Sequence, residues 1–375
     1  MFHLTAHRLE VTLEALTPVE LNEHQGASLR GALYGALRER FCAQKQVAGC
    51  AACVLVAGCP VATLVSTLDA QAERGRDVPR PYVIEPPRDG RTRLAPGECL
   101  TFGLTLFARA LQLFPYVVLA LQGLEETGLG KPVAANGWRR GKVRLARAAA
   151  SNPLSGECRA VLEPGEALVQ VPDVPVRHAQ VLRAAAQMPA GRVAVEFLTP
   201  TRLVEGGRLL KRPEFGPLFH RLWQRLSDLE REFGERLTAE SQRVGTLTPG
   251  PSPTAGERGE GASETHHPDS ASRPWPAPAA GERGEGADGA SETDEGYRLV
   301  GLARAVRLVE DGTRWVELES YSTRQRRATP ISGFVGRAVY EGDLGPFLPW
   351  LVWGQFVHVG KDAVKGNGWY VVREA

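Results

Sequence analysis

The residues near the C-terminus that are best suited to chemistry are a histidine and two lysines set among glycines. The run HVGKDAVKGNGWYVV, residues 358–372, contains His358, Gly360, Lys361, Lys365, Gly366 and Gly368 in that order. Glycine lets the backbone approach a phosphate closely, and lysine supplies a mobile positive charge. The segment therefore suits a polyphosphate chain, and the alternative is a tight helix-to-strand connection with solvated lysines. The spacing is not that of a P-loop, and no Ser or Thr follows the lysine, which argues against an NTPase.

A second candidate site lies in LNEHQGASLRGALYGALRERFC, residues 21–42. His24 stands at the predicted start of a helix, and Arg30, Tyr34 and Arg38 follow at four-residue intervals, which places those three side chains along one stripe. A histidine near arginine and tyrosine suits a general acid or base beside an anion. The alternative is that His24 caps the helix and Tyr34 is part of the core.

Four cysteines follow this helix with the spacing C-x7-C-x2-C-x5-C: Cys42, Cys50, Cys53 and Cys59. In a reducing compartment, four thiols this close together favour a metal over disulfides. Two alternatives remain open, a structural zinc ion or four reduced structural cysteines. A zinc hydrolase is disfavoured, because four cysteine ligands leave no open coordination position. Cys99 and Cys158 have no spaced partners and are expected to be small core residues.

An arginine cluster occurs in ELESYSTRQRRATPISGF, residues 317–334, which contains Tyr321, Arg324, Arg326 and Arg327. Arginines with a neighbouring tyrosine can bind phosphates and stack on a base. The same cluster would equally suit the surface of a hairpin.

The elements that must position these residues repeat one order twice. Apolar periodicity predicts a strand over 7–16, a helix over 25–44, strands over 81–86 and 100–108, a helix over 113–126 and a strand over 142–149. The second series is a strand over 191–204, a helix over 214–236, strands over 297–309, 314–320 and 333–340, a helix over 344–356 and a strand over 369–372. The first series gives the order βαββαβ, and the second gives the same order with one additional strand. This order predicts an α+β protein with two tandem ferredoxin-like (RRM-like) domains, residues 1–170 and 171–375.

Residues 245–296 differ from the rest of the chain in composition. The stretch is rich in Pro, Gly, Ala, Ser and Glu, repeats GERGEGA at 256–262 and 281–287, and carries a net charge of −7. It is predicted to be a disordered low-complexity insert in the second domain. The remaining 323 residues carry a net charge of +9, which is compatible with a polyanionic partner such as RNA. With neither a signal peptide nor an apolar run of about 20 residues, the chain is expected to be cytoplasmic and to have no membrane partner.

Taken together, these segments resemble the CRISPR-associated precursor-RNA processing endoribonucleases of the RAMP superfamily, the Cas-six family. The resemblance rests on GASLRGALYGALR at 26–38, CPVATL at 59–64, VEFLTPTRLV at 195–204 and YSTRQ at 321–325. Its most specific parts are GFVGRAVYEGDL at 333–344 and HVGKDAVKGNGWYVV at 358–372. It covers nearly the whole chain apart from the insert.

The resemblance implies a protein that binds the repeat RNA of a CRISPR transcript and cuts it once per repeat without a metal ion. In that chemistry the 2′-hydroxyl attacks the scissile phosphate and leaves a 2′,3′-cyclic phosphate. His24 matches the family's catalytic histidine in location, with His358 as the rival and Tyr34 and Lys361 as partners. RNA contacts are expected from the glycine-rich loop with Lys365, and from Arg30, Arg38, Arg324, Arg326 and Arg327. No cofactor is expected for catalysis. The alternative is a non-catalytic RAMP subunit that holds crRNA beside other CRISPR effector subunits.

Overall fold

The computed structural model describes residues 3–47, 49–66, 79–166, 168–234, 292–322 and 327–375. The predicted insert lies outside these residues as far as position 291. Its last five residues, 292–296, belong to a helix. Among the described residues, no helix is long and apolar enough to cross a membrane.

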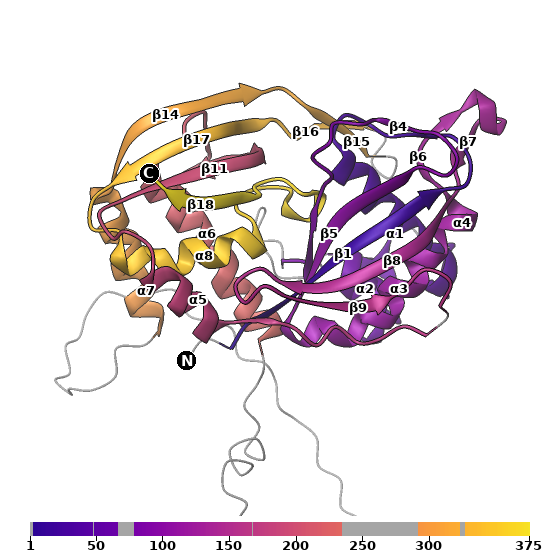
Figure 1. The fold of residues 1–375 in the computed structure, drawn as a ribbon, viewed down its shortest axis with the longest axis horizontal. Coiled ribbons are helices and arrows are strands. Elements are labelled where there is room, and N and C mark those ends of the chain that lie inside the picture. The colour runs from indigo at the N-terminus through magenta and orange to yellow at the C-terminus, as the bar shows by residue number, and fades with distance from the viewer. Residues whose placement is uncertain (1–2, 48, 67–78, 167, 235–291, 323–326) are drawn as a thin grey trace, which may run out of the picture. The chain divides into compact units, whose positions relative to one another are not determined.

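The first half of the chain forms an antiparallel sheet with helices packed against it (Figure 1). Its βαββαβ elements are β1 (Thr5–Ala15), α1 (Gln25–Phe41), β3 (Tyr82–Glu85), β5 (Cys99–Phe107), α3 (Phe114–Gln122) and β8 (Val143–Asn152). The strand order is β3-β5-β1-β8, and β9 (Glu157–Leu162) extends it. Shorter elements are β2 (Val19–Glu20), α2 (Pro60–Val65), β4 (Arg93–Leu94), α4 (Leu124–Thr127), β6 (Leu129–Val133), β7 (Arg139–Gly141) and β10 (Val176–Arg177).

The second half repeats this topology after the connecting helix α5 (His178–Ala186). Its main elements are β11 (Arg192–Thr201), α6 (Phe215–Phe233), β14 (Arg307–Val316), β17 (Gly333–Glu341), α8 (Leu348–Val357) and β18 (Tyr370–Glu374). The order β14-β17-β11-β18 corresponds strand for strand to that of the first sheet. Two small hairpins complete it: β12 (Leu203–Glu205) with β13 (Arg208–Leu210), and β15 (Glu319–Ser322) with β16 (Arg327–Pro330). The predicted α+β class with two ferredoxin-like domains is confirmed.

The prediction of a strand over 297–309 is wrong in its first part. Residues Glu292–Leu302 form helix α7, and β14 begins only at Arg307. Leu299 is buried, and Gly296 lies so close to the Trp223 ring of α6 that a Cβ would overlap it. Packing on α6 therefore decides the conformation of a sequence whose local alternation suggests a strand.

Each half has its own hydrophobic core, and each core takes residues from the other half. Val364, in the loop between α8 and β18, belongs to the core of the first half. Leu4, Ala6, Val83 and Phe107 belong to the core of the second half. The two halves therefore share buried apolar surface, the main source of stability in a fold.

The backbones of the two halves lie in close contact at two glycines, Gly26 and Gly366. A Cβ on Gly26, in the first turn of α1, would overlap the carbonyl oxygen of Lys365. Gly366, at φ +89°, would place a Cβ 2.6 Å from Pro86 Cδ and 2.9 Å from the Ile84 oxygen. The loop after α8 thus lies backbone-to-backbone against α1 and the end of β3.

We expect Gly26→Ala to destabilise the protein by about 1–3 kcal/mol, because the new methyl group must displace the loop at Lys365. Gly31→Ala and Gly35→Ala are matched controls on the same helix, since a Cβ added to either glycine would have no described atom within 4 Å. An alanine in an open helical position should stabilise by about 0.5–1 kcal/mol. Urea unfolding of the three variants measures this, and a Gly26→Ala variant as stable as the controls would contradict the close contact.

Candidate functional site

The glycine-rich loop, residues 358–368, is fixed to the end of β11 by backbone hydrogen bonds. The N–H of Lys361 donates to the carbonyl of Arg202 at 3.0 Å, and the N–H of Gly368 donates to that of Pro200 at 3.0 Å. Gly360 has a φ of +83°, and a Cβ there would lie 2.5 Å from the Arg202 oxygen. Gly360 therefore allows both the left-handed backbone and the close packing against Arg202, and it helps to hold the loop in one shape.

His24 is the N-cap of α1. This is the helix-capping role that the sequence left open beside an acid–base role. Its Nδ1 accepts a hydrogen bond from the N–H of Ala27 at 3.1 Å. Nδ1 therefore carries the lone pair, and in the neutral ring the proton sits on Nε2. Nε2 is buried and has no hydrogen-bond partner among the described residues.

The surroundings of His24 come from the glycine-rich loop. Burial lowers the pKa of His24, whereas the Asn367 side chain and the charge of Asp362 act against that shift and Lys365 adds to it. Lys365 Nζ lies 2.9 Å from Asp362 Oδ1 in a largely buried ion pair. Asn367 is fully buried and donates to the carbonyl of Ile331 at 2.9 Å. A histidine, a cation and a carboxylate from the two halves thus meet at one junction.

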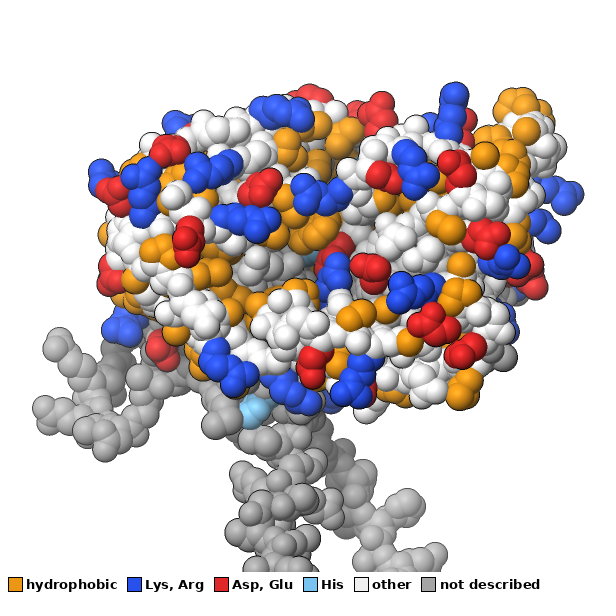
Figure 2. Space-filling model, in the orientation of Figure 1, with side chains coloured by type: hydrophobic (Ala, Val, Ile, Leu, Met, Phe, Trp, Pro, Cys, Tyr) orange, Lys and Arg blue, Asp and Glu red, His pale blue; other side chains and the backbone are white. Residues whose placement is uncertain are grey.

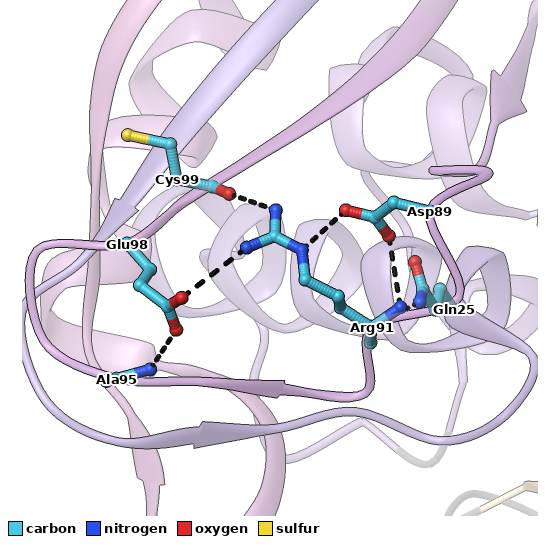
Figure 3. A network of polar contacts seen from close by, with 6 residues as sticks. All are labelled: Gln25, Asp89, Arg91, Ala95, Glu98 and Cys99. Atoms are coloured by element: carbon cyan, nitrogen blue, oxygen red, sulfur yellow. Dashed lines mark hydrogen bonds and ion pairs between the residues drawn. The ribbon is translucent and has the colours of Figure 1, made fainter.

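The start of α1 is braced by the loop between β3 and β5. Gln25 Nε2 donates to the carbonyl of Arg91 at 2.6 Å (Figure 3). Arg91 in turn bonds Asp89 at 2.7 Å and the carbonyl of Cys99 at 2.9 Å. This network fixes the residue that follows His24, so the position of the histidine does not depend on α1 alone.

Tyr34 and Arg38 lie elsewhere on α1. Tyr34 is ten residues beyond His24, about 15 Å along the helix axis. The guanidinium of Arg30 lies over the Tyr34 ring, 5.7 Å from its centre. Arg38 donates to the carbonyl of Lys45 at 2.8 Å. The structure therefore does not bring Tyr34 to His24.

His358 is fully buried and stacks on the Trp369 ring, with 6.1 Å between the centres. Neither ring nitrogen has a hydrogen-bond partner in the part of the chain that the structure describes, and burial lowers the pKa of His358 to about 3. In this conformation His358 has no access to an RNA strand. Lys361, three residues further on, is exposed.

The four clustered cysteines line one cavity of about 60 Å³, together with Tyr34 and Arg38. All four are free thiols of intermediate exposure. Within the described residues, no group of three or more His, Cys, Asp or Glu side chains is arranged to hold a metal ion. The expectation for Cys99 and Cys158 is wrong, because both are exposed. Each lies in a strand at a position that faces solvent.

The arginine cluster is only partly described. Arg327 begins β16, opposite Ser322 in the hairpin. Arg324 and Arg326 lie outside the described residues. The hairpin that the sequence suggested is present.

One arrangement was not foreseen from the sequence. His220 on α6 has its Nδ1 2.8 Å from Glu205 Oε1, and Arg221 lies 2.9 Å from the other oxygen of the same carboxylate. The His220 ring is partly exposed. No spacing rule could have found this group, because Glu205 lies in β12 and the pairing depends on the tertiary fold.

The comparisons with known proteins agree with this architecture. Residues 195–370 match the family model of the CRISPR-associated endoribonuclease Cas6, and residues 4–174 match a model described as an N-terminal domain. None of the curated proteins is a significant match.

Three solved structures illustrate the similarity. A Cas6 of Thermus thermophilus is 12% identical, with a TM-score of 0.45 and 99% of each chain covered. A Cas6 product complex is 15% identical, with a TM-score of 0.48, and the match covers 98% of this chain and 99% of the other. A partial Cas6-RT-Cas1–Cas2 complex is 11% identical, with a TM-score of 0.52, and the match covers all of this chain and 47% of the other. At 11% identity, the similarity to this partial complex supports the fold alone.

The duplicated ferredoxin-like topology and the match of residues 195–370 to the family model define one class of protein, the CRISPR-associated endoribonucleases. Within that class, the chain belongs to the Cas6 family. Membership makes it an endoribonuclease that processes CRISPR repeat RNA.

The free energy of unfolding should fall as the pH drops from 7 to 5. Burial lowers the pKa of His7 to about 4 and that of His358 to about 3, so both rings stay neutral in the folded protein over this range. The unfolded chain takes up protons below the ordinary histidine pKa of about 6.5. Each ring should therefore lower the free energy of unfolding by about 1.4 kcal/mol per pH unit between its pKa in the unfolded chain and its pKa in the folded protein. Urea unfolding at pH 7, 6 and 5 measures the slope, and an unchanged stability would contradict the burial of these rings.

Proposed function

We propose that this chain cuts repeat RNA without a metal ion where the start of α1 meets the glycine-rich loop. The 2′-hydroxyl beside the scissile phosphate attacks phosphorus, the bond to the 5′-oxygen breaks, and the products end in a 2′,3′-cyclic phosphate and a 5′-hydroxyl. The junction itself supports this most, because the backbone of Lys365 lies against Gly26, two residues after His24, and the charges of Lys365 and Asp362 act on the pKa of His24.

The reaction needs a base for the 2′-hydroxyl, an acid for the leaving 5′-oxygen and positive charge for the phosphorane. Lys365 is a fixed cation at the junction, and its pairing with Asp362 sets its position. Lys361 is an exposed cation on the same loop, and it makes no ion pair with any described residue. We assign Lys361 and Lys365 to the phosphate, with Arg30 on α1 as a further contact.

His24 acts as the base only after its ring leaves the helix cap. With Nδ1 engaged by Ala27, the neutral ring offers a proton on Nε2 and has no free lone pair. Loss of an N-cap hydrogen bond costs about 0.5–2 kcal/mol, a small fraction of a catalytic barrier. Bound RNA can therefore replace the cap, and the lowered pKa keeps the ring neutral and ready to accept a proton.

The variants His24→Asn and His24→Ala separate catalysis from capping. Asparagine is a good N-cap but cannot transfer a proton at neutral pH, whereas alanine loses both roles. We expect His24→Asn to keep the wild-type stability and RNA affinity and to cut at least about 100-fold more slowly. His24→Ala should be equally slow and about 1 kcal/mol less stable.

Cleavage by His24→Asn at the wild-type rate would show that His24 only caps α1 and takes no part in catalysis. In that case His220→Ala and His358→Ala, assayed in parallel, identify the histidine that carries the reaction. Loss of cleavage in His220→Ala alone would move the centre to the His220–Glu205 pair.

The reaction type is tested by incubating the chain with its own genome's CRISPR repeat RNA in excess EDTA. We expect one cut per repeat, multiple turnover and a cyclic phosphate end. Tight binding without cleavage would instead favour the non-catalytic RAMP subunit. Loss of cleavage in EDTA, restored by a divalent ion, would overturn the metal-independent mechanism.

Further RNA contacts are proposed along the strand on either side of the scissile phosphate. These are Arg38 on α1, Arg327 in β16, and Arg324 and Arg326, which lie outside the described residues. Gly360, the partly exposed glycine of the loop, is assigned to the same surface, because it lets the loop backbone approach RNA. Gly366 and Gly368 are buried against Pro86 and Val359, so their part in RNA binding is to shape the loop. Because one structural neighbour is a Cas6-RT-Cas1–Cas2 complex, association with other CRISPR proteins is also proposed, and co-purification tests it.

We further propose a structural zinc ion at the cysteine cavity. The four thiols line this cavity but are not arranged to hold an ion in this structure, so binding would have to draw them together. Cys42 ends α1, Cys50 and Cys53 bracket one short helical turn, and Cys59 precedes α2, so a single ion would tie these ends together. In the same segment Val54 is 88% exposed, which leaves little apolar packing to order it.

Protein purified without added zinc should contain about one zinc per chain. Cys53→Ser should lose the metal and melt at a lower temperature, while the exposed Cys99→Ser should retain it. Metal-free protein with four titratable thiols and an unchanged melting temperature would support four reduced structural cysteines instead.

A further inference from the structure

The hairpin β6–β7 carries an exposed tryptophan at its tip. Trp138 is 75% exposed and has a φ of +60°, a left-handed backbone that non-glycine residues rarely adopt. Its N–H closes the turn by donating to the carbonyl of Val133 at 3.0 Å. Among the described side chains, the only other aromatic of comparable exposure is Tyr297. A strained backbone that presents a large apolar ring to solvent points to binding.

The hairpin is fixed at its turn, by Asn136, and at its base, by Gly130 and Gly141. Asn136 Nδ2 donates to the carbonyl of Pro18 at 2.7 Å. A Cβ on Gly130 would overlap the carbonyl of Glu20, and one on Gly141 would lie 2.5 Å from the Pro18 oxygen. The hairpin therefore packs backbone-to-backbone on β2, and Trp138 is presented in a defined position and not on a loose loop.

The hairpin is also strongly basic. Residues 129–142 contain no acidic residue and four basic ones, Lys131, Arg139, Arg140 and Lys142. Arg139 and Arg140 are exposed, and neither makes an ion pair or side-chain hydrogen bond with any residue that the structure describes. In Figure 1 the β6–β7 hairpin projects at one corner, and in Figure 2 hydrophobic atoms form that tip with Lys and Arg side chains near it.

We propose that this tryptophan hairpin, residues 129–142, is a second RNA contact, in which Trp138 stacks on an unpaired base and Arg139 and Arg140 bind the flanking phosphates. An exposed aromatic ring beside free guanidinium groups has the chemistry of a single-stranded RNA site. A protein partner would not require this excess of unpaired positive charge. The proposal rests on the proposed function, because repeat RNA is the strand that it binds.

The test is the affinity of the full chain for its CRISPR repeat RNA, measured with Trp138→Ala, Trp138→Phe and Arg139→Ala/Arg140→Ala. Base stacking on one aromatic ring is worth about 5- to 150-fold in affinity. We expect Trp138→Ala to weaken binding within that range and Trp138→Phe to restore most of it. The double arginine variant should lower the slope of log K against log salt by about 0.7 per lost phosphate contact.

Tyr297→Ala is the matched control, because Tyr297 is 77% exposed but follows acidic residues on α7. It should bind as the wild type does. All these side chains are exposed, so the variants should unfold at the wild-type temperature.

Wild-type binding by Trp138→Ala, with wild-type protein that binds and cuts the repeat, overturns the hairpin contact and leaves the proposed function intact. An equal loss in Trp138→Ala and Tyr297→Ala also overturns it. If the wild-type chain neither binds nor cuts repeat RNA, the proposed function itself has failed.

Discussion

The contact between the glycine-rich loop and the start of α1 is the constraint on which the rest of this structure depends. It is backbone against backbone, so no side chain can be added to Gly26 or Gly366 without moving one half of the protein from the other. Val364 in the same loop enters the core of the first half. The loop therefore joins the two cores and brings Asp362 and Lys365 to His24.

Burial decides what the histidines can do. His7 and His358 are held neutral inside the two halves, which removes them from proton transfer with bound RNA. His24 lies at the junction with one nitrogen engaged by its helix. Capping and catalysis both use Nδ1 of His24, so the two roles exclude each other. Because the cap hydrogen bond contributes only about 0.5–2 kcal/mol, bound RNA can replace it. Basic side chains are interspersed with acidic ones over the face in Figure 2, so local cations matter more than overall charge.

Much of the fold could be predicted from the sequence, because the alternation in β1 and the four-residue spacing in α1 each reflect one buried face. The helix at Tyr297 could not, since its conformation depends on packing against Trp223. His24 could be located, but its tautomer and its neighbours Asp362 and Asn367 depend on contacts across more than 300 residues of chain. The His220–Glu205 pair is invisible in the sequence for the same reason.

The most direct test of a junction centre is photocrosslinking of repeat RNA that carries 4-thiouridine beside the scissile phosphate, with the crosslinked peptides identified by mass spectrometry. The account predicts crosslinks to both residues 22–30 and residues 359–368 in the same complex. Crosslinks confined to one half, or to α6 around His220, would contradict it.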